Sequence, residues 1–217
     1  MRRVISLACM AALSLAAAIG TVSSASAATG TTECNGQLKP GSYGRVVVPK
    51  DAVCLSRGPV TVRDGLWIGS GATFLLGSER SGWTTGTIDD GVHATDPASV
   101  QVHFATINGG VRVEGGSGAF GGPFDITWNA IEDNVIHGGV SVSGYDGFWF
   151  GFIRNRVSGT VTMRDNVLQD PDGNEYVTNT IHGALACTGN DPAPQVGDSQ
   201  GSPTCVTGRK TGQCANV

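Results

Sequence analysis

Short apolar stretches separated by glycine or polar residues recur along the chain, and four of them follow one seven-residue pattern. Each copy reads apolar, polar, Gly, small, apolar, polar, apolar, and the copies begin 29, 21 and 24 residues apart: Ile107–Val113, Ile136–Val142, Val157–Met163 and Ile181–Cys187. A degraded copy begins at Ile88. Repeats of about 20 to 25 residues built on short β-branched strands are typical of solenoid folds.

The pattern predicts an all-β fold, a parallel β-helix. Helical repeats need apolar residues at a spacing of 3.6, which is missing, and leucine-rich repeats need far more Leu than this chain contains. Strand-length stretches continue upstream, so we expect about six or seven coils between Arg45 and Asn190. One glycine in each heptapeptide marks a corner where a Cβ would restrict the backbone: Gly109, Gly138, Gly159 and Gly183.

The residues upstream of each heptapeptide also align: Val100–Ile107, Phe124–Ile131, Phe150–Val157 and Asn174–Ile181. In this alignment Asn129, Asn155 and Asn179 share one position, which predicts a ladder of stacked asparagine side chains. The same alignment leaves five residues, Glu132–Ile136, as an insertion after the second block.

The first segment has the pattern of a secretory signal peptide. Arg2 and Arg3 precede an apolar run that ends near Ile19, and Ala25–Ala27 supplies small residues for cleavage. The apolar run is shorter than the about 18 residues of a membrane-spanning helix. We therefore expect a signal peptide over residues 1–27, a single domain over 28–217, and a secreted, extracellular protein.

Composition and charge exclude several partners. Glycine accounts for 33 of the 217 residues without a three-residue period, so the chain is not collagen-like. Without Arg2 and Arg3, 12 of the 14 basic residues remain beside 18 acidic residues, which gives a formal charge of −6. Because there is no basic run, we expect no nucleic-acid partner and no binding to an anionic membrane. We expect a monomer.

Five cysteines follow the predicted cleavage site, at the two ends of the solenoid. In an oxidising compartment such pairs close as disulfides. The spacing favours Cys34 with Cys54, and Cys187 with either Cys214 or Cys205, which leaves one thiol over. We expect terminal caps at about residues 29–44 and 191–217, each tied to the core by one bridge.

Four segments around these cysteines carry a resemblance to a known family: Cys34–Gly36, Val53–Leu55, Leu185–Pro194 and Gly208–Cys214. They resemble a family of small secreted actinobacterial β-helix proteins, and the similarity covers nearly the whole chain after residue 27. The resemblance implies export and a right-handed, pectate-lyase-like helix, but brings no catalytic residues. With Cys205 outside the family pattern, we expect Cys34–Cys54 and Cys187–Cys214 bridges and an unpaired Cys205.

Stacked coils turn sequence columns into spatial neighbours, and two columns suggest chemistry. One holds Asn108, His137, Ser158 and His182, in which His137 and His182 form an acid/base pair or, more simply, part of a hydrogen-bonded polar ladder. The other holds Gln101, Asp125, Gly151 and Glu175, with Asp125 and Glu175 as a carboxylate pair of the glycosidase type. Nearby Arg154 would bind a uronate carboxylate, or these charges form ordinary solvated ion pairs.

Aromatic residues concentrate between residues 120 and 152. Phe124, Phe150 and Phe152 fall at core positions, whereas Trp128, Tyr145 and Trp149 are candidates for a sugar-binding platform or for a lateral core.

An acidic segment around Asp170 and Asp172 offers oxygen ligands for Ca²⁺, but it lacks the third spaced acid of an EF-hand loop and reads better as a turn. No cofactor is otherwise indicated. The sequence favours a protein that acts on extracellular polysaccharide, as a lyase or glycoside hydrolase. The alternative is a non-catalytic cell-wall, glycan-binding or structural protein.

Overall fold

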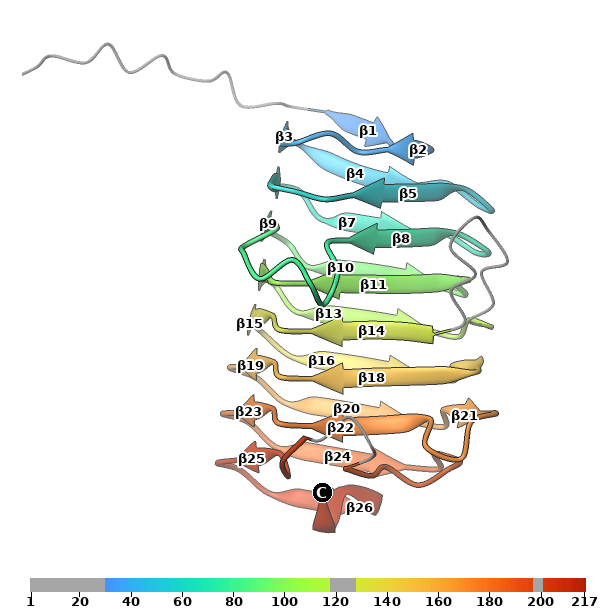
Figure 1. Cartoon of the computed structure of the whole chain (residues 1–217), viewed down its shortest axis with the longest axis vertical. Helices are drawn as coiled ribbons and strands as arrows, with labels where there is room; N and C mark the ends of the chain where they lie inside the picture. Colours follow the sequence, from blue (N-terminus) through green and yellow to red (C-terminus); the bar gives the residue numbers. More distant parts are fainter. Residues whose placement is uncertain (1–29, 118–127, 197–200) are drawn as a thin grey trace, which may run out of the picture.

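The computed structural model describes residues 30–117, 128–196 and 201–217, and its strands stack into three long parallel sheets (Figure 1). Every described strand pair within these sheets is parallel, and non-consecutive strands are neighbours. The chain is therefore all-β, and its layout is compatible with the β-helix solenoid that the repeats predict.

Sheet A has nine strands in the described part of the chain. They are β1 (Thr31–Glu33), β4 (Arg45–Val48), β7 (Leu66–Ile68), β10 (Val92–Thr95), β13 (Val111–Glu114), β16 (Val140–Ser143), β20 (Val161–Arg164), β24 (Leu185–Thr188) and β26 (Lys210–Gly212).

Sheet B carries the candidate site and has seven described strands. They are β2 (Gly36–Gln37), β5 (Val53–Ser56), β8 (Thr73–Leu76), β11 (Ser99–His103), β14 (Trp128–Glu132), β18 (Trp149–Ile153) and β22 (Asn174–Val177).

Sheet C has eight described strands. They are β3 (Gly41–Tyr43), β6 (Val60–Val62), β9 (Gly86–Ile88), β12 (Ala105–Asn108), β15 (Val135–His137), β19 (Arg156–Val157), β23 (Thr180–Ile181) and β25 (Cys205–Val206). A small separate pair joins β17 (Asp146–Gly147) to β21 (Val167–Leu168), and the 3-10 helix η1 (Gln213–Asn216) ends the chain.

The predicted heptapeptide register is confirmed. Ile107 pairs with Ile136, Ile136 with Val157 and Val157 with Ile181, and all four side chains are fully buried. Ile88, the degraded copy, pairs with Ile107 in the same column. This stack of β-branched residues is a central column of the core, because neighbouring strands in a sheet bring like side chains into contact.

The predicted corner glycines lie where successive coils approach closely. A Cβ on Gly159 would lie 2.4 Å from the carbonyl oxygen of Gly138, and one on Gly183 would lie 2.4 Å from that of Gly159. Gly138 itself has φ +149°, which L side chains rarely adopt.

The predicted asparagine ladder exists, but one of its members is different. Asn134, not Asn129, shares the ladder with Asn155 and Asn179. The backbone N–H of Asn134 donates to Oδ1 of Asn155 at 3.1 Å, and that of Asn155 donates to Oδ1 of Asn179 at 2.9 Å. The extra residues of this coil therefore lie between β13 and β14 rather than at 132–136.

Both terminal bridges are confirmed: Cys34–Cys54 and Cys187–Cys214, with Cα–Cα distances of 5.4 and 5.2 Å, and Cys205 is free and exposed. The terminal segments are more regular than expected. Strands β1 to β3 lie within 29–44 and join the three sheets, and β25, β26 and η1 lie within 191–217. The predicted signal peptide lies outside the described residues.

Candidate functional site

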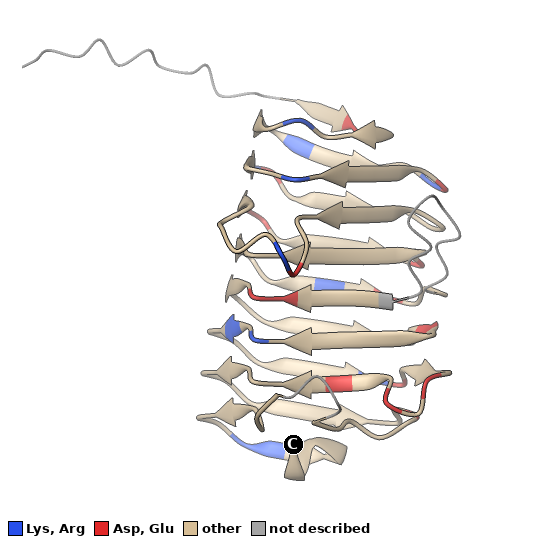
Figure 2. Ribbon diagram, in the orientation of Figure 1, with Lys and Arg blue, Asp and Glu red and all other residues tan. Residues whose placement is uncertain are grey.

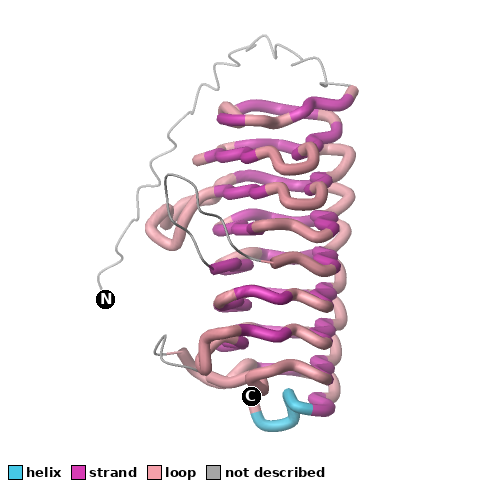
Figure 3. The backbone as a smooth tube through the Cα atoms, turned by 90° about the vertical axis from the view of Figure 1, so that its right-hand side faces the viewer, coloured by secondary structure: helices cyan, strands magenta, loops and turns pink. Residues whose placement is uncertain are grey.

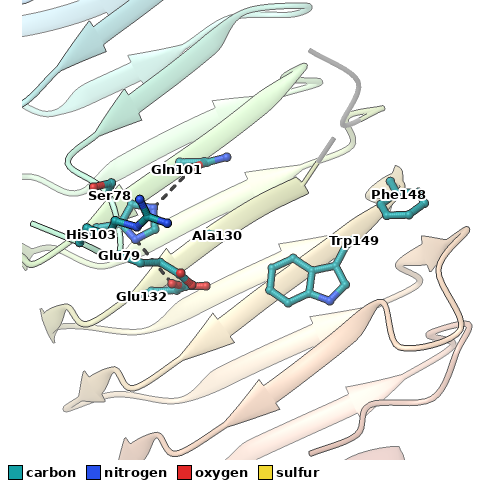
Figure 4. A pocket seen from close by; sticks show the side chains of 9 residues that line it. Ser78, Glu79, Gln101, His103, Ala130, Glu132, Phe148 and Trp149 are labelled. Atoms are coloured by element: carbon teal, nitrogen blue, oxygen red, sulfur yellow. Dashed lines mark hydrogen bonds and ion pairs between the residues drawn. The ribbon is translucent and has the colours of Figure 1, made fainter. Parts of the chain in front are cut away.

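A cavity of about 450 Å³ lies on the outer face of sheet B. The segment between β8 and β9 stands out from the stacked coils (Figure 3) and supplies one wall. The lining residues are Ser78, Glu79, Arg80, Gln101, His103, Ala130, Glu132, Phe148 and Trp149 (Figure 4). The cavity therefore joins a loop to three adjacent strands.

Strand alternation and register bring the polar lining together. His103 on β11 is paired with Glu132 on β14, and Gln101 is paired with Ala130, which is paired in turn with Gly151 on β18. Since residues two apart point to the same side of a strand, these side chains share the outer face of sheet B. All five residues of β11 are buried, so this face is covered as well as the core face.

Glu132 is a buried acid in the cavity, and its pKa is strongly raised. Its side chain is 1% exposed, and burial, followed by a hydrogen bond to Glu79 and the charge of Glu79, raises its pKa to about 9. Asp133 raises this pKa further, whereas Arg154 lowers it. The carboxyl of Glu132 is therefore protonated at neutral pH and donates its proton to the hydrogen bond with Glu79.

His103 is buried next to this acid and is neutral. Its side chain is 2% exposed, and burial lowers its pKa to about 4 despite the nearby carboxylates of Glu79 and Asp133. Nε2 lies 3.5 Å from Oε1 of Gln101. Because an amide oxygen only accepts hydrogen bonds, this contact assigns the ring proton to Nε2. Nδ1 then faces Oε2 of Glu132 at 3.6 Å and makes no hydrogen bond within the described residues. Because both partners are neutral, this contact is not an ion pair.

Arg154 also contacts Glu132, at the same carboxyl oxygen, Oε2, that His103 approaches. Its Nε lies 2.7 Å from Oδ1 of Asp133, its Nη2 lies 2.9 Å from Oδ2 of Asp133, and the same Nη2 lies 3.4 Å from Oε2 of Glu132. The bidentate pair with Asp133 neutralises the guanidinium charge locally.

Two aromatic side chains form the opposite part of the lining. Phe148 is 42% exposed and Trp149 is half-buried. A Cβ on Gly151 would lie 2.2 Å from the Trp149 ring and 3.1 Å from Oε1 of Glu132. The indole and the Glu132 carboxyl therefore both approach the bare backbone of Gly151, and apolar surface of this kind favours the uncharged form of the acid.

The predicted carboxylate column is found in part. Gln101, Gly151 and Glu175 do lie in one column across the strands of sheet B, but the position expected for Asp125 is occupied by Ala130. Asp125 lies outside the described residues. Glu175 on β22 is fully buried and does not line the cavity.

His137 and His182 belong to the sheet C side of the coils, where both side chains are exposed. Asn108 pairs with His137 as expected, and the hydroxyl of Ser158 accepts a hydrogen bond from the N–H of Gly138. Neither histidine lines the cavity. These contacts fit the polar-ladder interpretation better than an acid/base pair.

The predicted aromatic platform needs a correction at Tyr145. This side chain is 1% exposed and accepts a hydrogen bond from the side-chain amide of Asn129, so it belongs to the core and offers no surface to a sugar. Trp149 does line the cavity. The backbone of Trp128 pairs with Trp149, and its side chain lies outside what the structure describes.

Sequence reasoning missed Glu79, His103 and Glu132. The available signal was the strand Ser99–His103, in which polar Gln101 and His103 alternate with valines. Charged residues are sparse along the described strands, which makes Glu132 at the end of a strand conspicuous (Figure 2).

Asp170 and Asp172 form a turn, in which the N–H of Asp172 donates to Oδ1 of Asp170 at 3.0 Å. Among the described residues, no group of three or more His, Cys, Asp or Glu side chains could hold a metal ion. In that part of the chain no helix is long and apolar enough to cross a membrane.

Comparison of the chain with protein-family models, curated proteins and solved structures found no match. The functional argument therefore rests on the geometry of the cavity.

Proposed function

We propose that this protein binds an extracellular polysaccharide on the outer face of sheet B and cleaves a glycosidic bond by acid/base catalysis. The observation that carries the proposal is the buried, protonated carboxyl of Glu132, hydrogen-bonded to Glu79 in a cavity that also contains Trp149. An acid kept protonated at neutral pH beside a second carboxyl group is the chemistry that glycoside hydrolysis needs.

In this proposal Glu132 is the general acid and Glu79 the general base. Glu132 gives its proton to the glycosidic oxygen as the C–O bond breaks, and Glu79 takes a proton from the water that attacks the anomeric carbon. Inverting hydrolases hold the two carboxyl groups roughly 6.5–9.5 Å apart. Since the two groups are in contact here, Glu79, on the exposed loop, must move aside when a sugar enters.

A lyase would need a free cation for the uronate carboxylate, and Arg154, the arginine predicted for that role, is held by Asp133 instead. This contact favours hydrolysis over elimination. One observation favours non-catalytic binding as the second candidate: the direct hydrogen bond between Glu132 and Glu79 leaves no room for a reacting bond between them.

Right-handed winding and export belong to the same proposal. Parallel strands of one sheet are joined by right-handed connections in about 98% of cases. Two disulfides are compatible with an oxidising compartment, and residues 1–27 have the signal-peptide pattern.

The test is a polysaccharide panel read for both new reducing ends and unsaturated products. We expect reducing ends only, and we expect Glu132→Gln to lose at least about 100-fold in rate while it still binds the substrate. Glu114→Gln is the matched control, because Glu114 is exposed on sheet A and paired with Arg112. Binding without turnover in the wild type would select the second candidate, and unsaturated products would select a lyase.

A further inference from the structure

The buried wall of the cavity is uncharged at neutral pH. It consists of the amide of Gln101, the neutral imidazole of His103 and the protonated carboxyl of Glu132, in adjacent strands and in mutual contact. Each of these groups can exchange hydrogen bonds with a hydroxyl group, and none of them attracts an anion by its charge.

The formal charges around this wall sum to zero. Arg154 is engaged by both carboxylate oxygens of Asp133. On the exposed loop, Glu79 and Arg80 are adjacent in sequence and opposite in charge, and both line the cavity. Among the described lining residues there is thus no excess of positive charge for a carboxylate-bearing sugar to meet, and the carboxylate of Glu79 would repel one.

The remaining lining is apolar: Trp149, Phe148 and Ala130. An indole beside hydrogen-bonding groups suits a pyranose ring, whose C–H face packs on the aromatic ring while its hydroxyl groups reach the polar wall.

We propose that the cavity is selective for uncharged glycans, with a neutral pyranose packed on Trp149 and hydrogen-bonded to Gln101 and His103, and that it discriminates against polyuronates. This inference rests on the proposed function, since it names the substrate class of the same site.

The first test compares neutral and anionic probes of equal length. Isothermal titration calorimetry with xylohexaose, cellohexaose and mannohexaose should give at least one affinity that is about tenfold or more above that for hexagalacturonate. Tighter binding of hexagalacturonate would overturn the selectivity and leave the proposed function standing. Failure of every probe and of the polysaccharide panel to bind would overturn the proposed function itself.

The second test removes the ion pair with Asp133 that holds the guanidinium of Arg154. Asp133 has φ +58°, and asparagine is the substitution best tolerated there, so Asp133→Asn should fold. The freed Arg154 should raise the affinity for hexagalacturonate about tenfold and change the affinity for the neutral probe little. Asp64→Asn makes the same change in net charge at an exposed turn and should leave both affinities unchanged. Equal gains in the two variants, or no gain in Asp133→Asn, would overturn the argument from charge compensation.

Discussion

The indole of Trp149 occupies the space in which a side chain at Gly151 would lie. The two residues are two positions apart on β18, so both belong to the same face of sheet B, and the ring folds back over the glycine toward Glu132. The absence of a side chain at Gly151 is therefore what allows an aromatic platform and a buried acid to meet.

Gly151→Ala should push the indole out of this position. A Cβ at 2.2 Å from the ring is far inside van der Waals contact, whereas the extended backbone of β18 accepts alanine. We expect binding of a neutral hexasaccharide to weaken about tenfold, which corresponds to the loss of one aromatic contact of roughly 1–1.5 kcal/mol. Calorimetric titration measures the affinity, and thermal unfolding checks the fold.

The control for this prediction is a double-mutant cycle. Trp149→Ala alone should weaken binding by more than about 1 kcal/mol, and adding Gly151→Ala to it should change little, because the clash is gone. Additive losses from the two substitutions would show that Gly151 acts by another route.

Glu132 should make the folding stability depend on pH. Its folded pKa of about 9 lies above the ordinary value of 4.5, so the folded state holds a proton that the unfolded state has lost. The stabilising contribution is complete below about pH 4.5 and is lost as the pH rises toward 9, by on the order of 1.4 kcal/mol per pH unit. His103, whose pKa is lowered to about 4, opposes this trend only below about pH 6.5.

The measurement is urea denaturation of the wild type and of Glu132→Gln between pH 6.5 and 9. Glutamine cannot ionise, so the variant should become progressively more stable than the wild type as the pH rises. Parallel curves for the two proteins would mean that Glu132 is ionised throughout and is not the general acid.

The heptapeptide repeat was enough to predict the core column from Ile107 to Ile181, because identical spacing in every coil leaves only one stacking. It could not place the extra residues of the second coil. Asn129 and Asn134 were both available for the ladder, and both amides reach the backbone of the preceding coil, Asn129 at the N–H of Val100 and Asn134 at the N–H of Ala105. Asn134 is the ladder member because its side-chain amide donates to Oδ1 of Asn155 in the next coil.

Because the sequence alignment put Asn129 rather than Asn134 in the ladder, it also missed the candidate site. With Asn134 in the ladder, Glu132 falls opposite His103. With Asn129 there, Glu132 becomes part of an insertion. Tyr145 was beyond sequence reasoning for a different reason: it follows β16 at a turn, where no alternation indicates which side chain is buried.

The ladder itself can be tested at Asn155, which is 1% exposed. Its amide donates to the carbonyl of Ile131 at 2.7 Å, and its Oδ1 accepts from the backbone of Asn134 at 3.1 Å. Asn155→Ala removes both of these buried hydrogen bonds and should cost about 2–4 kcal/mol of unfolding free energy, measured by urea denaturation. Asn108→Ala removes a half-exposed amide that bonds to Asp89 and should cost less than about 1 kcal/mol.

The terminal bridge gives the last prediction. Cys187 and Cys214 are buried and close a loop of 27 residues, whereas Cys205 is exposed. A thiol reagent added to the folded, unreduced protein without residues 1–27 should modify Cys205 alone. Replacing Cys187 and Cys214 together by alanine should lower the unfolding free energy by on the order of 3 kcal/mol in the loop-entropy model, while Cys205→Ser should change it little. Cleavage before Asp191 and Asp198 separates Cys187 from Cys205, and cleavage after Arg209 or Lys210 separates Cys205 from Cys214. Peptide mapping without reduction therefore identifies the partner of Cys214 directly. A bridge from Cys205 to either of the other two cysteines would contradict the pairing and would detach the C-terminal turn η1 from β24, where Cys187 now anchors it.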